Sequence, residues 1–262
     1  MRRLAGGDVN DVVALTLDDG RTVVVKGNAR APAGLFAAEA RGLAFLAAPE
    51  ALRTPAVLAV ADDFLVLEHV ARGRPAPDHD ERLGRGLAAL HRASPSQVPG
   101  LDHDNFIGPL PQQNAPTDDW ATFYGERRLF PMAARGQLDR RARRRLEALV
   151  ARLPGLVGPP EAPSRLHGDL WGGNLLTDPA GLPCLIDPAV YAGHREMDLA
   201  MMRLFGGFGS RVFAAYAEAH PLAEGHEERV PLYQLYPLLV HVALFGGGYV
   251  GGVERALTQL GV

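Results

Sequence analysis

The sequence is poor in cysteine, in lysine and in long uninterrupted apolar runs. Its 262 residues include one cysteine, Cys184, so an internal disulfide is excluded and we expect a small buried hydrophobic side chain there. The one stretch apolar enough to suggest a membrane span, residues 230–253, contains Pro231, Pro237 and a glycine cluster, and therefore predicts a buried pair of helices. The N-terminal residues show no signal-peptide pattern, so we expect a cytoplasmic protein without membrane contact.

A strong excess of charge of either sign is also missing. The formal net charge is −3 at pH 7, which gives no electrostatic reason to expect a nucleic-acid partner. In the arginine-rich segment 139–153, Ala142, Leu146 and Leu149 recur at helical spacing, so we expect the arginines to form the solvated face of a helix. The chain is long enough, at 47% hydrophobic residues, for one large domain or two smaller lobes.

Lysine is the scarcest of the charged residues. Of the 27 basic residues, Lys26 alone is a lysine and all the others are arginines. A chain that uses arginine everywhere else retains lysine where a compact ammonium on a flexible stem is required, although chance is the alternative explanation. The scarcity therefore singles out Lys26 as a candidate site residue.

Short β-rich runs fill the first 70 residues. Residues 12–17 and 21–26 flank an Asp-Gly turn, and residues 57–60 and 64–70 flank a second turn, which predicts two antiparallel hairpins. Between them, residues 34–48 carry apolar side chains at helical spacing. We therefore expect a small antiparallel sheet with one inserted helix, in which Lys26 ends a strand.

Helical patterns dominate from residue 79 onward, apart from a brief β pattern between residues 165 and 187. The turn-prone segment 71–77 separates the two regions. We therefore predict an α+β fold with two lobes. The first is a small antiparallel β-rich lobe over residues 1–70, and the second is a larger, mainly helical lobe over residues 71–262 that carries a short hairpin.

Two carboxylates and an amide stand at fixed spacing around that short hairpin. Residues 167–174 read HGDLWGGN and contain Asp169 and Asn174, and Asp187 follows. Oxygen ligands of this kind suit Mg²⁺, and the pattern is that of a kinase catalytic loop. We expect Asp169 to accept the proton of an attacking hydroxyl, and Asn174 and Asp187 to hold a metal over phosphates. Taken singly, Asp169 and Asn174 are equally typical of turns.

Features of the first lobe fit the same phosphoryl-transfer site. Lys26 matches a strand-borne lysine that neutralises phosphate charge, and Glu39 on the following helix matches the acid that pairs with it. Two glycines before the first predicted strand would bring backbone N–H groups close to a phosphate, and the last three residues of the lobe would form a hinge against an adenine. An ordinary strand end is the alternative for that hinge. The candidate nucleotide-binding residues are Lys26, Glu39, Gly6, Gly7, Glu68, His69 and Val70.

Four longer motifs extend this pattern: HGDLWGGN, DPA from Asp187, YAGHREMDLAM from Tyr191, and LDHDNFIGPLPQQNAPTDDWATFYGERRL from Leu101. Together they resemble the fructosamine kinase (ketosamine 3-kinase) family, whose fold is similar to that of aminoglycoside phosphotransferases and protein kinases. Aminoglycoside and choline kinases generally share the HGD…N…D core without the last of these motifs. The resemblance covers nearly the whole chain and implies a two-lobed, protein-kinase-like fold.

The resemblance implies an ATP-dependent phosphotransferase that uses Mg²⁺. Asp169 would be the catalytic base, Asn174 and Asp187 would be metal ligands, and Lys26 with Glu39 would act at the phosphates. The implied acceptor is the 3-hydroxyl of a ketosamine, which is a small-molecule or protein-bound glycated amine. Phosphorylation there would lead to release of the free amine, and deglycation would be the purpose of the reaction.

The resemblance also assigns supporting roles and shows a departure. Trp171 is a candidate platform for a sugar-like substrate, with core packing as the alternative. Asp8 stands in the glycine loop where the family often has a small residue or a cysteine, so the phosphate contacts of this loop are open and cysteine-based redox control is not expected. The residues expected to support the catalytic loop from behind are His194, Arg195, Glu196 and Asp198.

Two other functions stay open at this point. One is a kinase for another hydroxyl compound, such as an aminoglycoside or choline, which acidic residues of the helical lobe would favour if they faced the site. The other is a nucleotide-binding pseudokinase, against which the presence of Lys26, Asp169, Asn174 and Asp187 argues. The sequence leaves the sugar, the nucleotide preference, the number of Mg²⁺ ions and the oligomeric state undetermined. The acids considered were Asp118, Asp119, Glu126 and the segment 224–228.

Overall fold

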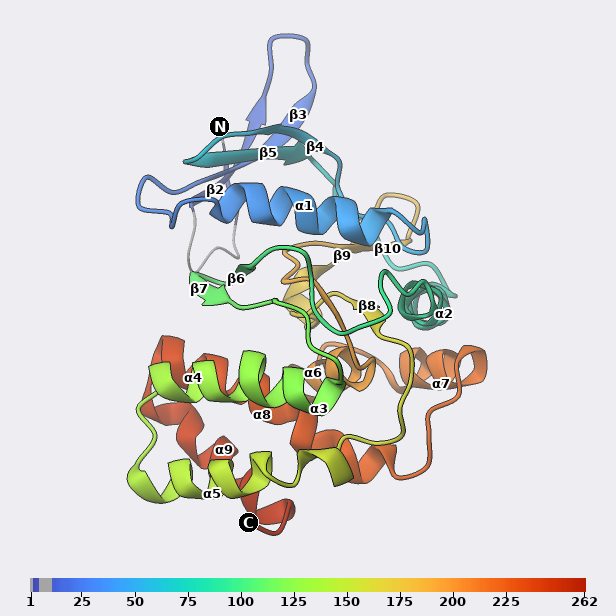
Figure 1. Cartoon of the computed structure of the whole chain (residues 1–262). Coiled ribbons are helices and arrows are strands. Elements are labelled where there is room, and N and C mark those ends of the chain that lie inside the picture. The colour runs from blue at the N-terminus through green and yellow to red at the C-terminus, as the bar shows by residue number, and fades with distance from the viewer. Residues whose placement is uncertain (1, 5–10) are drawn as a thin grey trace.

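A five-stranded antiparallel sheet forms the N-terminal part of the chain. The computed structural model describes residues 2–4 and 11–262, and Figure 1 shows the sheet above a larger helical part. The strand order is β1-β2-β3-β5-β4. The strands are β1 (Arg2–Arg3), β2 (Asp11–Thr16), β3 (Thr22–Gly27), β4 (Val57–Val60) and β5 (Phe64–Glu68).

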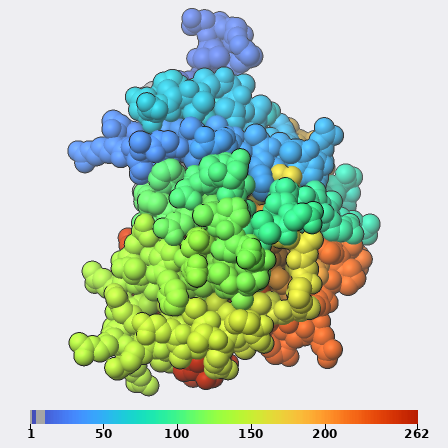
Figure 2. Space-filling view, viewed as in Figure 1, coloured from blue at the N-terminus to red at the C-terminus, as the bar shows by residue number. Residues whose placement is uncertain are grey.

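Helix α1 (Leu35–Ala47) lies between β3 and β4 in the sequence and covers one face of the sheet. Phe36 and Leu43 of the helix pack with Leu65 and Leu67 of β5 in a buried cluster, as the alternation of β5 and the helical period of α1 require. The tip of the β2–β3 hairpin projects beyond the rest of the molecule (Figures 1 and 2). Both predicted hairpins and the inserted helix are therefore confirmed, whereas β1 was not predicted.

Among the described residues, every α-helix except α1 belongs to the C-terminal part, and the chain enters it through an irregular connection at residues 69–76. A division at residues 70 and 71 stays a prediction. The helices are α2 (His79–Arg92), α3 (Trp120–Phe123), α4 (Phe130–Arg135), α5 (Arg140–Val150), α6 (Glu196–Phe205), α7 (Ser210–Ala219), α8 (His226–Phe245) and α9 (Val250–Gln259).

Two apolar clusters hold this helical part together. The larger one is built from α3 to α5, α8 and α9, and includes the buried Leu146 and Leu149 of α5, whose arginines face solvent as expected. The other joins α2, α6 and α7, and it also takes in Leu46 from the end of α1. Because one cluster receives a side chain from α1, apolar packing attaches the sheet region to the helical region.

Two short antiparallel strand pairs cross the middle of the molecule. Strand β8 (Ser164–Leu166) pairs with β11 (Tyr191–Gly193), and β9 (Leu175–Thr177) pairs with β10 (Pro183–Leu185). The β9–β10 hairpin is the one predicted around the Pro-Ala-Gly turn. The β8–β11 pair encloses this hairpin in the sequence, so the connecting segments 167–174 and 186–190 both begin and end at paired strands.

Some elements differ from the sequence-based expectation. The Pro-, Asn- and Gln-rich stretch before α3 contains a hairpin of β6 (Asn105–Ile107) and β7 (Leu110–Gln112), where no strand was predicted. Within the region of predicted helical pattern, a π-helical turn, Tyr124–Leu129, lies between α3 and α4. A π-turn has no strong sequence signal, because it changes the hydrogen-bond spacing without changing the residue types that form it.

The C-terminal stretch forms α8, a short turn and α9, and α8 and α9 pack against each other, as predicted. Among the described residues, none of the helices is both long and apolar enough to cross a membrane.

The close contact between α2 and α7 allows a test of the helix packing. A Cβ placed on Gly84 of α2 would lie 2.2 Å from the carbonyl oxygen of Val212 in α7. We predict that Gly84→Ala lowers the free energy of unfolding by about 1–3 kcal/mol, because α2 and α7 must separate. The measurement is urea unfolding of the purified protein. Gly155→Ala is the matched control, since a Cβ there meets nothing within 4 Å; equal stability of the two variants would contradict the packing argument.

Candidate active site

The ammonium group of Lys26 lies between two carboxylates from distant parts of the chain. Lys26, next to the last residue of β3, places its Nζ 2.6 Å from Oε1 of Glu39 on α1 and in hydrogen-bonding contact with Oδ1 of Asp187. The Lys26 and Glu39 side chains are buried, at 8% and 13% exposure, whereas the Asp187 side chain is 33% exposed. The structure therefore brings together three of the predicted site residues.

The charges of this cluster set the protonation of Lys26. Burial alone would lower the pKa of its ammonium, but the nearby Asp187 and Glu39 carboxylates outweigh that effect and raise the pKa above its usual value. Lys26 is therefore a firmly protonated cation. A buried cation held by two anions is costly to desolvate, and it is suited to exchanging one of these partners for an anionic ligand.

The catalytic-loop residues are positioned by the two short strand pairs. Residues 167–174 connect β8 to β9 and residues 186–190 connect β10 to β11, so Asp169 and Asn174 come to lie beside Asp187. The Nδ2 of Asn174 donates to the main-chain oxygen of Asp169 at 2.8 Å and to its Oδ2 at 3.0 Å. The same Nδ2 lies 3.4 Å from the main-chain oxygen of Asp187, whose φ of 55° is unusual for a residue with a side chain.

The Asp169 carboxyl is prepared for proton transfer. Burial is the main cause that raises its pKa to about 7; the hydrogen bond from Asn174 opposes the rise, and the charges of Asp187 and Asp198 add to it. A base whose pKa lies near neutrality is well matched to accepting a proton from a hydroxyl at physiological pH.

Asp198 on α6 supports the loop from behind, as expected. Its two carboxylate oxygens accept the N–H groups of His167 and Gly168 at 2.8 and 2.9 Å, and Oδ2 also lies 3.2 Å from Nε2 of His91. Burial alone would raise the pKa of Asp198, but the hydrogen bonds from His91 and the loop lower it, so Asp198 is an anion. A Cβ at Gly168, where φ is 81°, would fall 2.1 Å from the oxygen of Ala189, so only glycine fits there.

The three residues grouped with Asp198 in the sequence have other contacts. Arg195 pairs with Glu161 at 3.1 Å, and Glu196 pairs with Arg229 at 2.7 Å. The His194 ring stacks on Tyr233, and burial lowers its pKa to about 3, so His194 is neutral. Asp198 is thus the member of the four that bonds to the catalytic loop, whereas the contacts described here for the other three stabilise the start of α6 and its neighbours.

A cavity of about 590 Å³ opens beside Lys26 and Asp187. The predicted hinge residues Glu68, His69 and Val70 line it, so the structure brings them to the same space as the lysine. The glycine loop, with Gly6, Gly7 and Asp8, lies outside the described residues. Apolar side chains also line the cavity. They are Val24 and Leu67 from the sheet, Leu176 from β9 and Ile186, which follows β10.

The side-chain oxygens of Asn174 and Asp187 suit a hard metal cation that phosphate oxygens also bind. Because the Asn174 amide nitrogen is engaged by Asp169, the atom that Asn174 offers a metal is Oδ1, and Asp187 offers carboxylate oxygens. Within residues 2–4 and 11–262 there is no cluster of three or more His, Cys, Asp or Glu side chains able to hold a metal. Two protein oxygens completed by phosphate oxygens and water are typical of Mg²⁺ sites, so the residues present fit Mg²⁺.

Trp171 is not a core residue. Its side chain is 42% exposed, and its ring covers Gly173, where a Cβ would lie 2.2 Å from the indole. The neighbouring Gly172 meets the chain that follows α6, with its N–H 3.1 Å from the oxygen of Gly206 and a Cβ of Gly172 only 2.9 Å from the Cα of Gly207. The catalytic loop and the end of α6 are thus in direct backbone contact.

Aromatic residues beside this contact were missed in the sequence analysis. Phe205, the last residue of α6, stacks on His241 of α8 with ring centroids 4.4 Å apart, and His241 also contacts Phe245 and Tyr249. Phe245 is 56% exposed. The signal available in the sequence was the aromatic spacing within residues 241–249, which a buried helix pair explains equally well.

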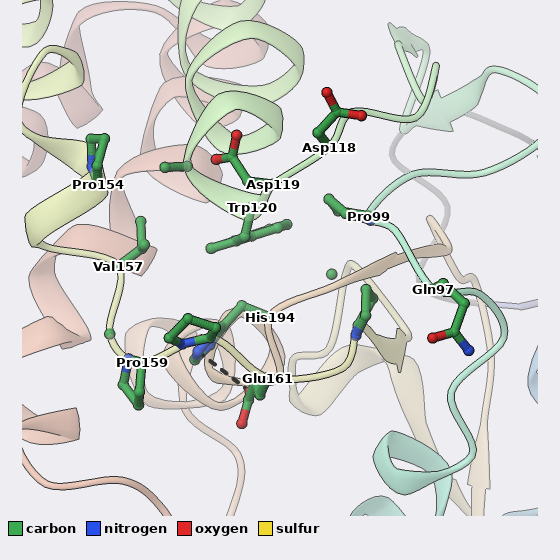
Figure 3. A pocket seen from close by; sticks show the side chains of 15 residues that line it. Gln97, Pro99, Asp118, Asp119, Trp120, Pro154, Val157, Pro159, Glu161 and His194 are labelled. Atoms are coloured by element: carbon green, nitrogen blue, oxygen red, sulfur yellow. Dashed lines mark ion pairs between the residues drawn. The ribbon is translucent and has the colours of Figure 1, made fainter.

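A second cavity, of about 410 Å³, lies on a different part of the helical region (Figure 3). Asp118 and Asp119, considered as acids for a cationic acceptor, line this cavity together with Trp120 and His194. The two cavities share none of their lining residues. Asp119 is also the N-cap of α3, accepting the N–H of Thr122 at 2.9 Å, so its placement has a structural cause.

Comparison with known proteins agrees with this geometry. The model of the fructosamine kinase family matches residues 1–261. A probable ketoamine kinase of Thermus thermophilus is 40% identical over 265 residues, which cover 97% of this chain and 92% of that protein. A chloroplastic protein-ribulosamine 3-kinase of Oryza sativa subsp. indica is 35% identical over 259 residues, which cover 94% of this chain and 74% of that protein.

Solved structures show the same fold. The crystal structure of a Thermobifida fusca protein assigned as a fructosamine-3-kinase matches with a TM-score of 0.90 and 41% identity, covering 99% of this chain and 93% of that one. The choline kinase LicA of Streptococcus pneumoniae matches with a TM-score of 0.65 and 14% identity, covering 99% and 92%, and therefore supports the fold alone. With a family model that spans all but the last residue, and a lysine, two acids and a catalytic loop in kinase-like arrangement, the chain belongs to the fructosamine kinase family and is an ATP-dependent phosphotransferase.

Proposed function

We propose that this protein transfers the γ-phosphoryl group of ATP to the 3-hydroxyl of a ketosamine, either a fructosamine or a ribulosamine. The observation that carries the proposal is the contact of Lys26 with Glu39 and Asp187 directly beside the Asp169–Asn174 loop. Membership of the fructosamine kinase family supports the ketosamine acceptor. The identity to a rice protein-ribulosamine 3-kinase supports the 3-hydroxyl.

The cavity beside Lys26 takes the nucleotide in this proposal. Its apolar walls, Val24 and Leu67 above and Leu176 and Ile186 below, suit the faces of an adenine, and the backbone of residues 68–70 meets the edge of the base. The Lys26 ammonium exchanges its contact with Asp187 for a phosphate oxygen and keeps Glu39 as the partner that orients it. Gly6 and Gly7 would contribute N–H groups to the phosphates.

Asn174 and Asp187 would hold Mg²⁺, which supplies charge screening at the β- and γ-phosphates. Asp169 accepts the proton of the 3-hydroxyl while the hydroxyl oxygen forms a bond to the γ-phosphorus and the bond to the bridging oxygen breaks, so that ADP leaves. Asn174 orients the Asp169 carboxylate through its 3.0 Å hydrogen bond. Positioning and charge stabilisation therefore supply most of the acceleration.

The acceptor approaches the Asp169 side of the loop. The exposed ring of Trp171 offers a flat apolar surface to the sugar, and the aromatic cluster around His241 lies next to the contact between the loop and α6. Loss of a proton from carbon 1 of the product gives an enaminol, from which the phosphate on carbon 3 leaves as inorganic phosphate. Water then hydrolyses the resulting imine and releases the amine. Deglycation of a small-molecule or protein-bound amine is the purpose that we assign to the reaction.

The first experiment compares acceptors. Purified protein with ATP and Mg²⁺ is offered a ribulosamine, a fructosamine, choline and an aminoglycoside, and ADP formation is measured. We expect turnover with one or both ketosamines, with a phosphate at carbon 3 shown by NMR. Turnover confined to choline or the aminoglycoside would replace the proposed acceptor, and ATP binding without any turnover would point to a pseudokinase.

The second experiment removes the proposed base. We predict that Asp169→Asn lowers kcat by about 10²–10⁴-fold, because a positioned base contributes that much, while ATP binding measured by calorimetry changes little. The exposed Asp62→Asn is the control for loss of one negative charge. Unchanged kcat in Asp169→Asn would overturn the assignment of the base.

The raised pKa of Asp169 also has a consequence for stability. The folded state favours the neutral carboxyl, so the ionised Asp169 destabilises the protein increasingly as the pH rises from about 4 to above 7. We therefore predict that Asp169→Asn is more stable than the wild type at pH 8 by about 4 kcal/mol, and that the difference shrinks toward pH 4. Urea unfolding at several pH values without metal or nucleotide measures it; a difference that grows as the pH falls would contradict the prediction.

A further inference from the structure

The β6–β7 hairpin carries a buried polar network that the proposed chemistry does not use. Asn105 on β6, Gln112 on β7 and Asn114 beyond it are at most 4% exposed, and Arg128 from the π-helical turn is fully buried. These residues belong to the motif that separates this sequence from aminoglycoside and choline kinases. Buried amides are expensive unless each hydrogen bond is made, so the partners of this network indicate its role.

Two of the amides bind the main chain just after Asp187. The Nε2 of Gln112 donates to the carbonyl oxygen of Ala189 at 3.0 Å, and the Nδ2 of Asn105 donates to that of Val190 at 2.8 Å. The N–H of Ala189 donates in turn to the main-chain oxygen of His167 at 2.9 Å. One peptide segment is thus fixed to the hairpin on one side and to the catalytic loop on the other.

The amides themselves are held in place by further contacts. Gln112 donates to Oδ1 of Asn105 at 2.8 Å and accepts the hydroxyl of Tyr236 from α8 at 2.5 Å. Asn114 donates to the same Oδ1 at 2.8 Å, and its own Oδ1 accepts from Arg128 at 2.7 Å. These contacts restrict the amides of Gln112 and Asn105 to one orientation, in which their N–H groups point to the carbonyl oxygens of residues 189 and 190.

Arg128 fixes the far end of the network without a carboxylate. Its guanidinium carbon lies 3.9 Å from the ring centroid of Tyr191 and 4.6 Å from that of Phe123. Within the described chain its hydrogen-bond acceptors are the main-chain oxygens of Gln113 and Arg127 and the amide oxygen of Asn114. A cation retained in the core on ring faces and neutral oxygens rigidifies the hairpin next to Tyr191.

Helix α1 closes the other side of the same segment. A Cβ at Gly42, one turn after Glu39, would lie 3.2 Å from Pro188 and 3.6 Å from Val190. Strand β6 also packs against α1 (Figure 1). The residues that follow Asp187 are therefore clamped between the helix that carries Glu39 and the amides of the hairpin.

We propose that the β6–β7 hairpin is a brace that positions the Asp187 carboxylate for its metal, with Gln112 and Asn105 acting as positioning residues through the carbonyls of Ala189 and Val190. The brace rests on the proposed function, because it assumes that Asp187 is a metal ligand. The brace fixes the distance between the Asp187 and Glu39 carboxylates. Because the Lys26 ammonium contacts both, this distance also fixes the position of the ammonium.

The test uses Gln112→Met, which keeps the length of the side chain and removes its N–H donors. We expect Mn²⁺ affinity, measured by electron paramagnetic resonance with a non-hydrolysable ATP analogue, to weaken about tenfold, as is usual when groups that orient metal ligands are lost. In the kinase assay, the Mg²⁺ concentration for half-maximal rate rises by the same factor, and excess Mg²⁺ restores most of kcat.

Tyr124→Phe is the matched control, because it also loses one buried hydrogen bond, from the Tyr124 hydroxyl to Leu232, without touching the brace. It should lose stability and keep wild-type Mn²⁺ affinity. If Gln112→Met does not fold, Tyr236→Phe removes the hydroxyl that orients Gln112 and is expected to weaken Mn²⁺ binding about two- to threefold.

Mn²⁺ affinity within experimental error of wild type in the folded Gln112→Met, or in Tyr236→Phe where the former does not fold, would overturn the brace. The metal titration needs no acceptor, so its result is independent of which hydroxyl is phosphorylated. Failure of the wild type to phosphorylate any ketosamine would instead overturn the proposed function.

Discussion

One ammonium group joins the two halves of this protein. Lys26 belongs to the sheet, Glu39 to the helix that covers it and Asp187 to the strand pairs of the helical part, and the lysine contacts both acids at once. Without a partner in the interior, the Lys26 ammonium or the Glu39 carboxylate would be costly, so the two acids stabilise the ammonium and the ammonium stabilises each acid. In the proposed mechanism Glu39 stays as the partner of Lys26, whereas Asp187, whose side chain is more exposed, turns to the metal.

Much of this arrangement could be predicted from the sequence because its signals are local. The Asp-Gly turn and alternating valines specify the β2–β3 hairpin, and the helical period specifies α1, so Lys26 and Glu39 were placed on the right elements. Asp169, Asn174 and Asp187 were found from their spacing around a hairpin that is present as β9–β10. Trp171 shows the limit, since residue type alone could not separate an exposed platform from a core residue.

What was missed depends on partners far away in the chain. In the sequence, Asn105 and Gln112 look like loop residues of a Pro- and Asn-rich stretch. Their role follows from hydrogen bonds to the carbonyls of residues 189 and 190, some 80 positions later. Three neighbours of Asp198 were grouped with it by proximity in sequence. His194 and Arg195 precede α6, and Glu196 faces another side of the helix than Asp198, which bonds to the loop.

The scarcity of lysine has a chemical consequence for a protein that acts on glycated amines. Reducing sugars condense with neutral primary amines, and Lys26 is the only side chain of that kind in the chain. It is buried, and its two acids hold it in the protonated, non-nucleophilic form. The chain thus offers sugars almost no lysine to modify, and the one amine side chain at its candidate active site is shielded from the modification that the proposed reaction would reverse in other molecules.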